Sequence, residues 1–400
     1  MIGINVLFSL LTFLIFACTT QLTYIKILLL LLILFILLTK GKVSYSMSSF
    51  HWILIYLLLN LCYLILGQVN GGKAFELYGM LYLVEPILYF VIVLPTVSLI
   101  SDTTVEKSLY ASFIFVDLIV LAAYIARRYN LTPMINVLEA LPCTIVTDNR
   151  FGYISVSSVS ISGLFFLIPY FTSLLFKSDE RKQKLAYGCG VILGLADSFL
   201  VGRRGLLAVI FISLIVYWVL NKAGERKDSR IKLKIDIKKQ LVFLIAFIII
   251  IAFAVSYFQR NGANMRLGNL SSDLVSAGDR ERTIEVTAMI REWERNPIFG
   301  TGYAINAEGS IRSDIVGSYE YSYLAMLYQT GLVGTIFYLL LYFYLANGTY
   351  KCWKLTENKH YLATCVGFIS LLIGNATNPY IGSFDGMWTL FYCLALINKL

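Results

Sequence analysis

Long apolar runs alternate with short polar segments along the whole chain. A membrane-spanning helix needs about 20 mostly apolar residues, because the bilayer core cannot accommodate unpaired backbone polar groups. Twelve runs approach this length, and each predicts a transmembrane helix. They are residues 4–19, 25–38, 51–66, 77–100, 109–125, 156–176, 185–201, 206–220, 241–258, 323–346, 361–373 and 383–397.

The composition supports a membrane protein. The 400 residues are 58% hydrophobic and only 14% charged, and the mean hydropathy is +0.73. Soluble domains are roughly half apolar and about a quarter charged. We therefore expect one all-α integral membrane domain over residues 1–400, with about 12 transmembrane helices.

The basic residues predict the orientation of this domain. They collect in four segments, which are residues 39–42, 177–184, 221–240 and 351–360. Even numbers of predicted spans separate these segments, and cytoplasmic loops carry an excess of lysine and arginine. We expect the four segments and both termini to face the cytoplasm. Topology and anionic headgroups then explain the formal net charge of +9, which gives no support for a nucleic-acid partner.

Cysteine and histidine argue against a metal site. The seven cysteines include no C-x-x-C pair and mostly lie in apolar runs, so we interpret them as small core residues. The chain has only two histidines, His51 and His360, which is too few for a typical histidine-based metal centre. We predict neither a metal nor a cofactor.

The same topology places residues 126–155, 201–205 and 259–322 outside. The third segment is long, and long structureless loops are uncommon, so we expect an ordered extracytoplasmic loop that is partly helical. Its middle predicts a helix with Asp279 as N-cap and Pro297 just after its end. The expected apolar face consists of Val286, Met289, Ile290 and Trp293. Such a helix could equally lie on the membrane interface or cap the bundle.

Charged and aromatic residues gather on this outward side. Arginine binds phosphate through two parallel hydrogen bonds, a carboxylate can act as a general base, and aromatic rings offer flat faces for sugars. Near the outer leaflet this combination fits a lipid-linked phosphorylated sugar. The candidates are Arg203, Arg204, Arg282, Arg291, Glu320, Tyr319, Tyr321 and Tyr323.

Each candidate also has a purely structural interpretation. Glu320 can be a solvated carboxylate at the end of a span. Arg203 and Arg204 can contact lipid headgroups. The three tyrosines fit an interfacial aromatic belt, which we rate above sugar stacking.

The blocks "LVGRRGLLAVI" and "DRERTIEVTAMIREWERNPIFGTGY", the latter followed by "EYSYLAMLYQTGLVG", resemble the O-antigen polymerase and ligase superfamily (Wzy/WaaL type). The first is similar to the family's Ser-Arg-Gly hairpin, with Arg204 at the family arginine and Arg203 where serine is usual. The second resembles a family pattern in which an arginine is followed by an amphipathic helix, a P-x-x-G-x-G segment and a span with Gly-x-x-Gly. Arg282 falls at that arginine, and Glu320 falls where the ligases keep an essential histidine. Arg291 begins an R-x10-G spacing described for some polymerases.

The resemblance implies a multi-pass glycosyltransferase of the bacterial cytoplasmic (inner) membrane that works on the outer face. Its donor would be a polyprenyl (undecaprenyl) diphosphate-linked oligosaccharide. The absent ligase histidine favours a polymerase of O-antigen, capsule or exopolysaccharide repeat units. Membrane lipids, a flippase and a chain-length regulator of the same pathway are the other implied partners.

The resemblance also implies a role for each candidate. Arg204 and Arg282 would stabilise charge on the diphosphate, supported by Arg203 and Arg291. Glu320 would take the proton from the attacking sugar hydroxyl. Direct displacement of the lipid diphosphate by the hydroxyl would invert the anomeric centre of the donor sugar. The reaction would need no metal ion.

Other functions compete with this interpretation. A ligase-type transferase would use a different acceptor. A lipid-linked oligosaccharide flippase would suit twelve spans with acidic residues at Glu85, Asp117 and Asp197, although the chain shows no internal repeat. We expect these three carboxylates to pair with arginines. A non-enzymatic scaffold would not need arginines and a carboxylate on one face.

Overall fold

The computed structural model describes residues 2–40, 45–143, 145–150, 153–201, 203–225, 277–309 and 319–399, which are mostly helical. Six described helices are long and apolar enough to cross a membrane, and they are Met47–Val69, Gly79–Leu99, Asp102–Arg128, Ser160–Lys177, Gly205–Gly224 and Ser322–Thr356. Three shorter apolar helices are Gly3–Ala17, Thr23–Thr39 and Lys359–Gly374. The described part of the chain is thus a multi-pass, all-α membrane domain. The run 241–258 lies outside the described residues, so about twelve spans stay a prediction.

The helices follow the apolar runs of the sequence closely. Their bounds are α1 (Ile2–Ala17), α2 (Thr23–Lys40), α3 (Met47–Val69), α4 (Leu77–Leu99), α5 (Asp102–Arg128), α6 (Thr132–Ala140), α7 (Leu164–Lys177), α8 (Arg181–Leu200), α9 (Arg204–Glu225), α11 (Ala277–Arg295), α12 (Ser322–Thr356), α13 (Lys359–Gly374) and α14 (Phe384–Asn398). The centre of the bundle is α7, α13 and α14, in which most side chains are buried. Around it, α13 packs on α7, and α14 packs on α4.

A short β-hairpin interrupts the helices, where the sequence predicted only a loop and the start of a span. Strand β1 (Ile145–Arg150) pairs antiparallel with β2 (Tyr153–Ser158), and Thr147 faces Val156. The predicted span at 156–176 therefore begins too early, because α7 starts only at Leu164 after a 3-10 turn at Val159–Gly163. The β-branched and aromatic residues of β2 favour a strand, and Val156 is buried.

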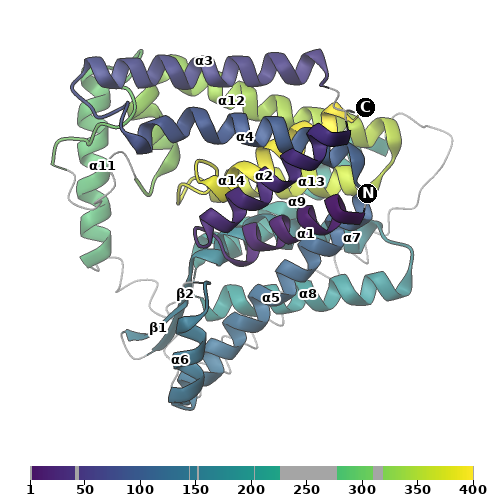
Figure 1. The fold of residues 1–400 in the computed structure, drawn as a ribbon. Helices are drawn as coiled ribbons and strands as arrows, with labels where there is room; N and C mark the ends of the chain where they lie inside the picture. Colours follow the sequence, from purple (N-terminus) through teal and green to yellow (C-terminus); the bar gives the residue numbers. More distant parts are fainter. Residues whose placement is uncertain are drawn as a thin grey trace.

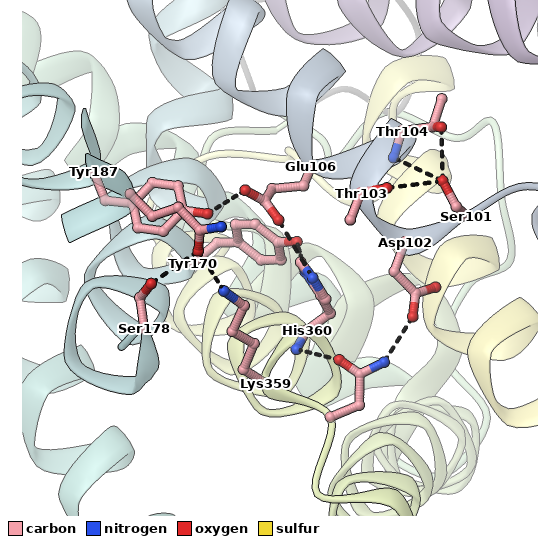
Figure 2. Close-up of polar contacts among 12 residues, drawn as sticks. Ser101, Asp102, Thr103, Thr104, Glu106, Tyr170, Ser178, Tyr187, Lys359 and His360 are labelled. Atoms are coloured by element: carbon pink, nitrogen blue, oxygen red, sulfur yellow. Dashed lines mark hydrogen bonds and ion pairs between the residues drawn. The ribbon is translucent and has the colours of Figure 1, made fainter. Parts of the chain in front are cut away.

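One end of the bundle carries a cluster of polar contacts. At this end, Asp102 accepts hydrogen bonds from Lys399 at 3.0 Å and from Asn358 at 2.7 Å. In Figure 2 the carboxylate of Glu106 lies between Tyr187 and His360 in the same polar cluster. The loops that precede α5, α8 and α13 thus meet the end of α14, as the counting of spans predicts. Both chain ends lie at the right in Figure 1, away from α11.

We expected Glu85, Asp117 and Asp197 to pair with arginines, and among the residues that the structure describes none of their charged neighbours is an arginine. Asp117 on α5 and Asp197 on α8 are both buried, and the charged neighbour of Asp117 is Asp197. The charged neighbour of Glu85 on α4 is Asp385. Asp385 in turn binds the buried ammonium of Lys26 on α2 at 2.7 Å. Lys26 thus compensates Asp385, which is not one of the three carboxylates that we expected to be paired.

Candidate functional site

Part of the segment that we expect to face outward, residues 277–295, forms α11, which stands across the ends of α3 and α12 at the left of Figure 1. The helix begins at Ala277, so Asp279 lies inside it and is not the N-cap that we predicted. It ends at Arg295, just before Pro297, as the sequence predicted. The backbone oxygen of Pro297 accepts a hydrogen bond from Nε1 of Trp293 at 3.3 Å, which ties the helix end to the following turn.

The buried face of α11 is not the apolar face that we expected. Met289 is fully buried, but Ile290 is 38% exposed. The residues of α11 that turn inward are Glu285, Ala288 and Met289. They meet the start of α12 in a small core made of Ala288, Met289, Ala307, Tyr319, Ala325 and Tyr328. Small and flexible side chains allow this close approach. The buried face of α11 therefore directs the Glu285 carboxylate, as well as apolar groups, towards α12.

The structure brings two predicted site residues into direct contact. Nε of Arg282 lies 2.6 Å from Oε2 of Glu320. The arginine side chain is 44% exposed and the glutamate side chain is 23% exposed, so solvent and ligands can reach the pair. A cation that binds phosphate and a carboxylate that can accept a proton thus share one location, two residues before α12 begins.

A second contact from α11 holds the same glutamate. Oε1 of the buried Glu285 accepts a hydrogen bond from the backbone nitrogen of Glu320 at 3.1 Å. Residues three apart on a helix lie on the same face, so Arg282 and Glu285 both point at Glu320. The helix therefore fixes both the backbone and the side chain of Glu320.

The glycines after α11 carry the chain against the end of α3. Gly302 has φ +92° and its backbone touches Gly67, where a Cβ at either position would collide. The next residue, Tyr303, donates a backbone hydrogen bond to Tyr63 O at 2.9 Å. Nδ2 of Asn70 donates to Thr301 O at 2.8 Å. Glycine is required here because the two backbones touch and because φ is positive.

The same segment also forms hydrogen bonds with backbone groups at a break in α12. Gly331 has φ 62° and ψ −172°, which interrupts the helix. The nitrogens of Leu332 and Val333 bond to the oxygens of Pro297 at 2.9 Å and Ile298 at 3.1 Å. In the other direction, Gly302 N donates to Gln329 O at 2.8 Å. The P-x-x-G-x-G segment thus satisfies backbone groups that the break leaves free, and it joins α11 rigidly to α12.

The three tyrosines beside Glu320 have different surroundings. Tyr319 is buried, and its hydroxyl accepts from Ala307 N at 2.7 Å. Tyr321 forms the N-cap of α12 and packs against the small core. Tyr323 donates to Leu372 O at 2.6 Å. These contacts are structural, and they favour the interpretation of the tyrosines as framework residues over sugar stacking.

Arg291 lies away from the pair. It is nine residues after Arg282, which corresponds to roughly half a turn of rotation around a helix at about 100° per residue. The side chain is exposed. The structure therefore does not bring Arg291 together with Glu320, and its predicted supporting role stays a prediction.

The hairpin before α9 contributes Arg203. Its Nη1 donates to the hydroxyl of Tyr380 at 2.7 Å. Tyr380 lies in the loop between α13 and α14. Arg204 is the first residue of α9, and its side chain lies outside the described part of the structure.

Sequence reasoning missed two residues of this region. Glu285 could have been found, because it lies three residues after Arg282 on a predicted helix. Tyr380 had no such signal, since it is far from every motif in the sequence. Within the described residues no group of three or more histidine, cysteine or acidic side chains could hold a metal ion.

Comparison with known proteins points to one family. Residues 189–339 match the family model described as O-Antigen ligase. The matched region includes Arg203, Arg282, Glu285 and Glu320, whereas Tyr380 lies beyond it. No curated protein matches the chain. The match agrees with the two sequence blocks and their geometry, and it does not separate polymerases from ligases. Over residues 189–339 the chain is therefore similar to the O-antigen polymerase and ligase superfamily.

Proposed function

We propose that this protein is a polysaccharide polymerase. It joins polyprenyl diphosphate-linked oligosaccharide repeat units on the outer face of the cytoplasmic membrane. The observation that carries the proposal is the Arg282–Glu320 contact at 2.6 Å. In such a reaction the diphosphate and the attacking hydroxyl meet at one sugar carbon, so a phosphate-binding cation and a base must belong to the same site.

The reaction is a single displacement. The acceptor hydroxyl oxygen attacks the anomeric carbon of the donor glycan, and the bond from that carbon to the diphosphate oxygen breaks. Glu320 takes the hydroxyl proton, and the lipid diphosphate leaves with its negative charge. Attack opposite to the leaving group inverts the anomeric centre. Arg282, with Arg203 and Arg204 from the hairpin, stabilises the charge on the leaving diphosphate. No metal ion takes part in this scheme.

The contact between Arg282 and Glu320 suggests how the donor starts the reaction. A carboxylate oxygen that holds the guanidinium cannot take a proton at the same position. A diphosphate binds arginine more strongly than a single carboxylate does, because it carries more charge and offers bidentate contacts. Donor binding would therefore draw Arg282 away and release Glu320 for the acceptor.

The scheme requires the pair to face outward, where the lipid-linked donor is exposed. Accessibility tags test this orientation. We expect tags at Gly224 and Lys359 to be protected from external reagents in intact cells, and a tag at Gly309 to be accessible. A protected Gly309 tag would contradict the proposed location of the site.

Reconstitution tests the activity itself. Purified protein with a polyprenyl diphosphate-linked repeat unit should produce a ladder of longer glycans. Arg282→Ala should lower the rate by at least about 10²-fold, because it removes one charge-stabilising donor. Arg295→Ala is the matched control: Arg295 lies on the same helix but pairs with Glu292 at 2.6 Å, away from the site. Equal rates for the two variants would exclude Arg282 from the mechanism.

The same assay separates the alternatives. A ligase-type transferase would give a single transfer to a second lipid-linked acceptor and no ladder. A flippase would move the donor between leaflets of a vesicle and form no new glycosidic bond. The glutamate at position 320, where ligases keep histidine, is the feature that favours the polymerase.

A further inference from the structure

The hydroxyl of Tyr380 holds the side chain of Arg203. Nη1 of Arg203 donates to this hydroxyl at 2.7 Å, across the gap between the α8–α9 hairpin and the α13–α14 loop. A second approach joins the same two segments, because a Cβ at Gly205 would lie 3.5 Å from Oγ1 of the Thr377 side chain. The contact is therefore part of a packed junction between two loops at the outward end.

The loop that carries Tyr380 is internally braced. Oδ1 of Asn375 accepts from Ile381 N at 3.0 Å, and Oγ of Ser383 donates to Tyr380 O at 2.7 Å. The ring of Tyr380 packs on Phe165 of α7 with 5.0 Å between centroids. Its hydroxyl consequently has a defined position, and a bond to it restricts the guanidinium of Arg203.

This junction lies beside the Arg282–Glu320 pair. Tyr323, in the first turn of α12, donates to Leu372 O at 2.6 Å, just before the loop begins. Burial raises the pKa of the Tyr380 phenol, the nearby Arg203 guanidinium lowers it, and the charge of Glu320 raises it. Glu320 is thus close enough to Tyr380 for its charge to affect the pKa of the phenol.

We propose that Tyr380 is a positioning residue of the donor site, which holds Arg203 so that its free N–H groups face the diphosphate of the lipid-linked donor. This inference rests on the proposed function for the identity of the ligand. It adds the α13–α14 loop, which lies beyond the family match at 189–339, to the parts that build the site.

A phenol suits this task for an electrostatic reason. A carboxylate partner would neutralise the arginine and weaken its attraction for phosphate. A neutral hydroxyl occupies one N–H of the guanidinium and leaves its full positive charge, with four of the five N–H donors, available to the ligand. It orients the side chain without competing with the diphosphate.

The test is a double-mutant cycle on ligand binding. Binding of a polyprenyl diphosphate without a glycan is measured on full-length protein in lipid nanodiscs, for the parent, Tyr380→Phe, Arg203→Gln and the double variant. Tyr380→Phe keeps the ring contact with Phe165 and removes only the hydroxyl. We expect it to raise Kd about 3- to 10-fold, as for the loss of one hydrogen bond. Tyr110→Phe is the control, because its hydroxyl bonds to Ala186 O at 2.9 Å, between α5 and α8.

The cycle distinguishes positioning from general structure. If Tyr380 acts through Arg203, Tyr380→Phe should add no further loss of affinity in the Arg203→Gln background. Additive effects, or a Kd for Tyr380→Phe equal to that of the parent and of Tyr110→Phe, would overturn the proposal. A parent protein that binds the probe but makes no glycan ladder would refute polymerisation, and the cycle would still decide the role of Tyr380. A parent that does not bind the probe would refute both.

Discussion

The backbone nitrogen of Glu320 donates to Oε1 of Glu285 at 3.1 Å, so a buried carboxylate on α11 positions an accessible carboxylate at the mouth of α12. The two acidic residues therefore differ in role. In the proposed reaction, Glu285 orients the chain and Glu320 exchanges its arginine partner for the substrate. The predictions below follow from this division.

Loss of the Glu285 acceptor should slow turnover without abolishing donor binding. Glu285→Ala removes the oxygen that fixes the backbone of Glu320, and we expect kcat to fall about 3- to 10-fold, the effect of one hydrogen bond. Glu285→Gln keeps an acceptor oxygen and should retain most of the rate. Steady-state kinetics of glycan extension measure both. Parental kcat in the alanine variant would show that this contact is irrelevant to the reaction.

Glu320→Gln should have the largest effect on the chemical step. The amide has nearly the same shape but cannot accept the hydroxyl proton, so turnover should fall by about 10²–10⁴-fold. Binding of the polyprenyl diphosphate should not weaken, since the arginines make those contacts and the amide no longer competes for Arg282. Glu308→Gln is the control, because Glu308 is an exposed glutamate of the same outer segment. If Glu320→Gln extends glycans at the parental rate, the base is another group.

Gly302→Ala should disrupt the junction between α11, α12 and α3. The substitution forces a side chain into the backbone of Gly67 and into a positive φ of 92°. We expect loss of folded protein or of activity, measured by size-exclusion chromatography in detergent and by glycan extension. Gly309→Ala is the matched control, since Gly309 also has positive φ (87°) but its Cβ would meet nothing within 4 Å. Similar behaviour of the two variants would mean that backbone strain, and not the contact with α3, is responsible.

Breaking the ion pair of Lys26 and Asp385 should destabilise the protein. The pair is buried, and the Lys26 ammonium also donates to Cys18 O at 2.8 Å. Lys26→Met leaves an uncompensated buried carboxylate, which typically costs about 3–5 kcal/mol. The double variant Lys26→Met/Asp385→Leu removes both charges and should recover much of the stability.

Thermal unfolding in detergent measures these differences. Lys73→Met serves as the control, because Lys73 pairs with Glu76 at 3.3 Å on the surface, where ion pairs contribute little. A single Lys26→Met variant as stable as Lys73→Met would show that Asp385 is compensated by another group.

Much of the architecture could be predicted from the sequence because it depends on local patterns. The apolar runs identify the helices through length and composition alone, and Pro297 marks the end of α11. The glycines at 300 and 302 indicate a tight segment, and the structure shows both with positive φ. The prediction failed where local signals compete. We predicted residues 156–176 as one span, yet residues 156–158 pair in a hairpin, because β-branched residues suit a strand as well as a span.

The sequence by itself determined the class of protein, the family resemblance and two candidate site residues, Arg282 and Glu320. Hydrophobic length and motif spacing suffice for this, because both are local properties of the chain. Only the tertiary structure decided which groups meet. It turned Glu285 inward on α11, kept Arg291 exposed, and joined Arg203 to Tyr380 between two loops. Such contacts depend on how helices pack and where loops cross, and their partners are too far apart in sequence for any periodic pattern to reveal them.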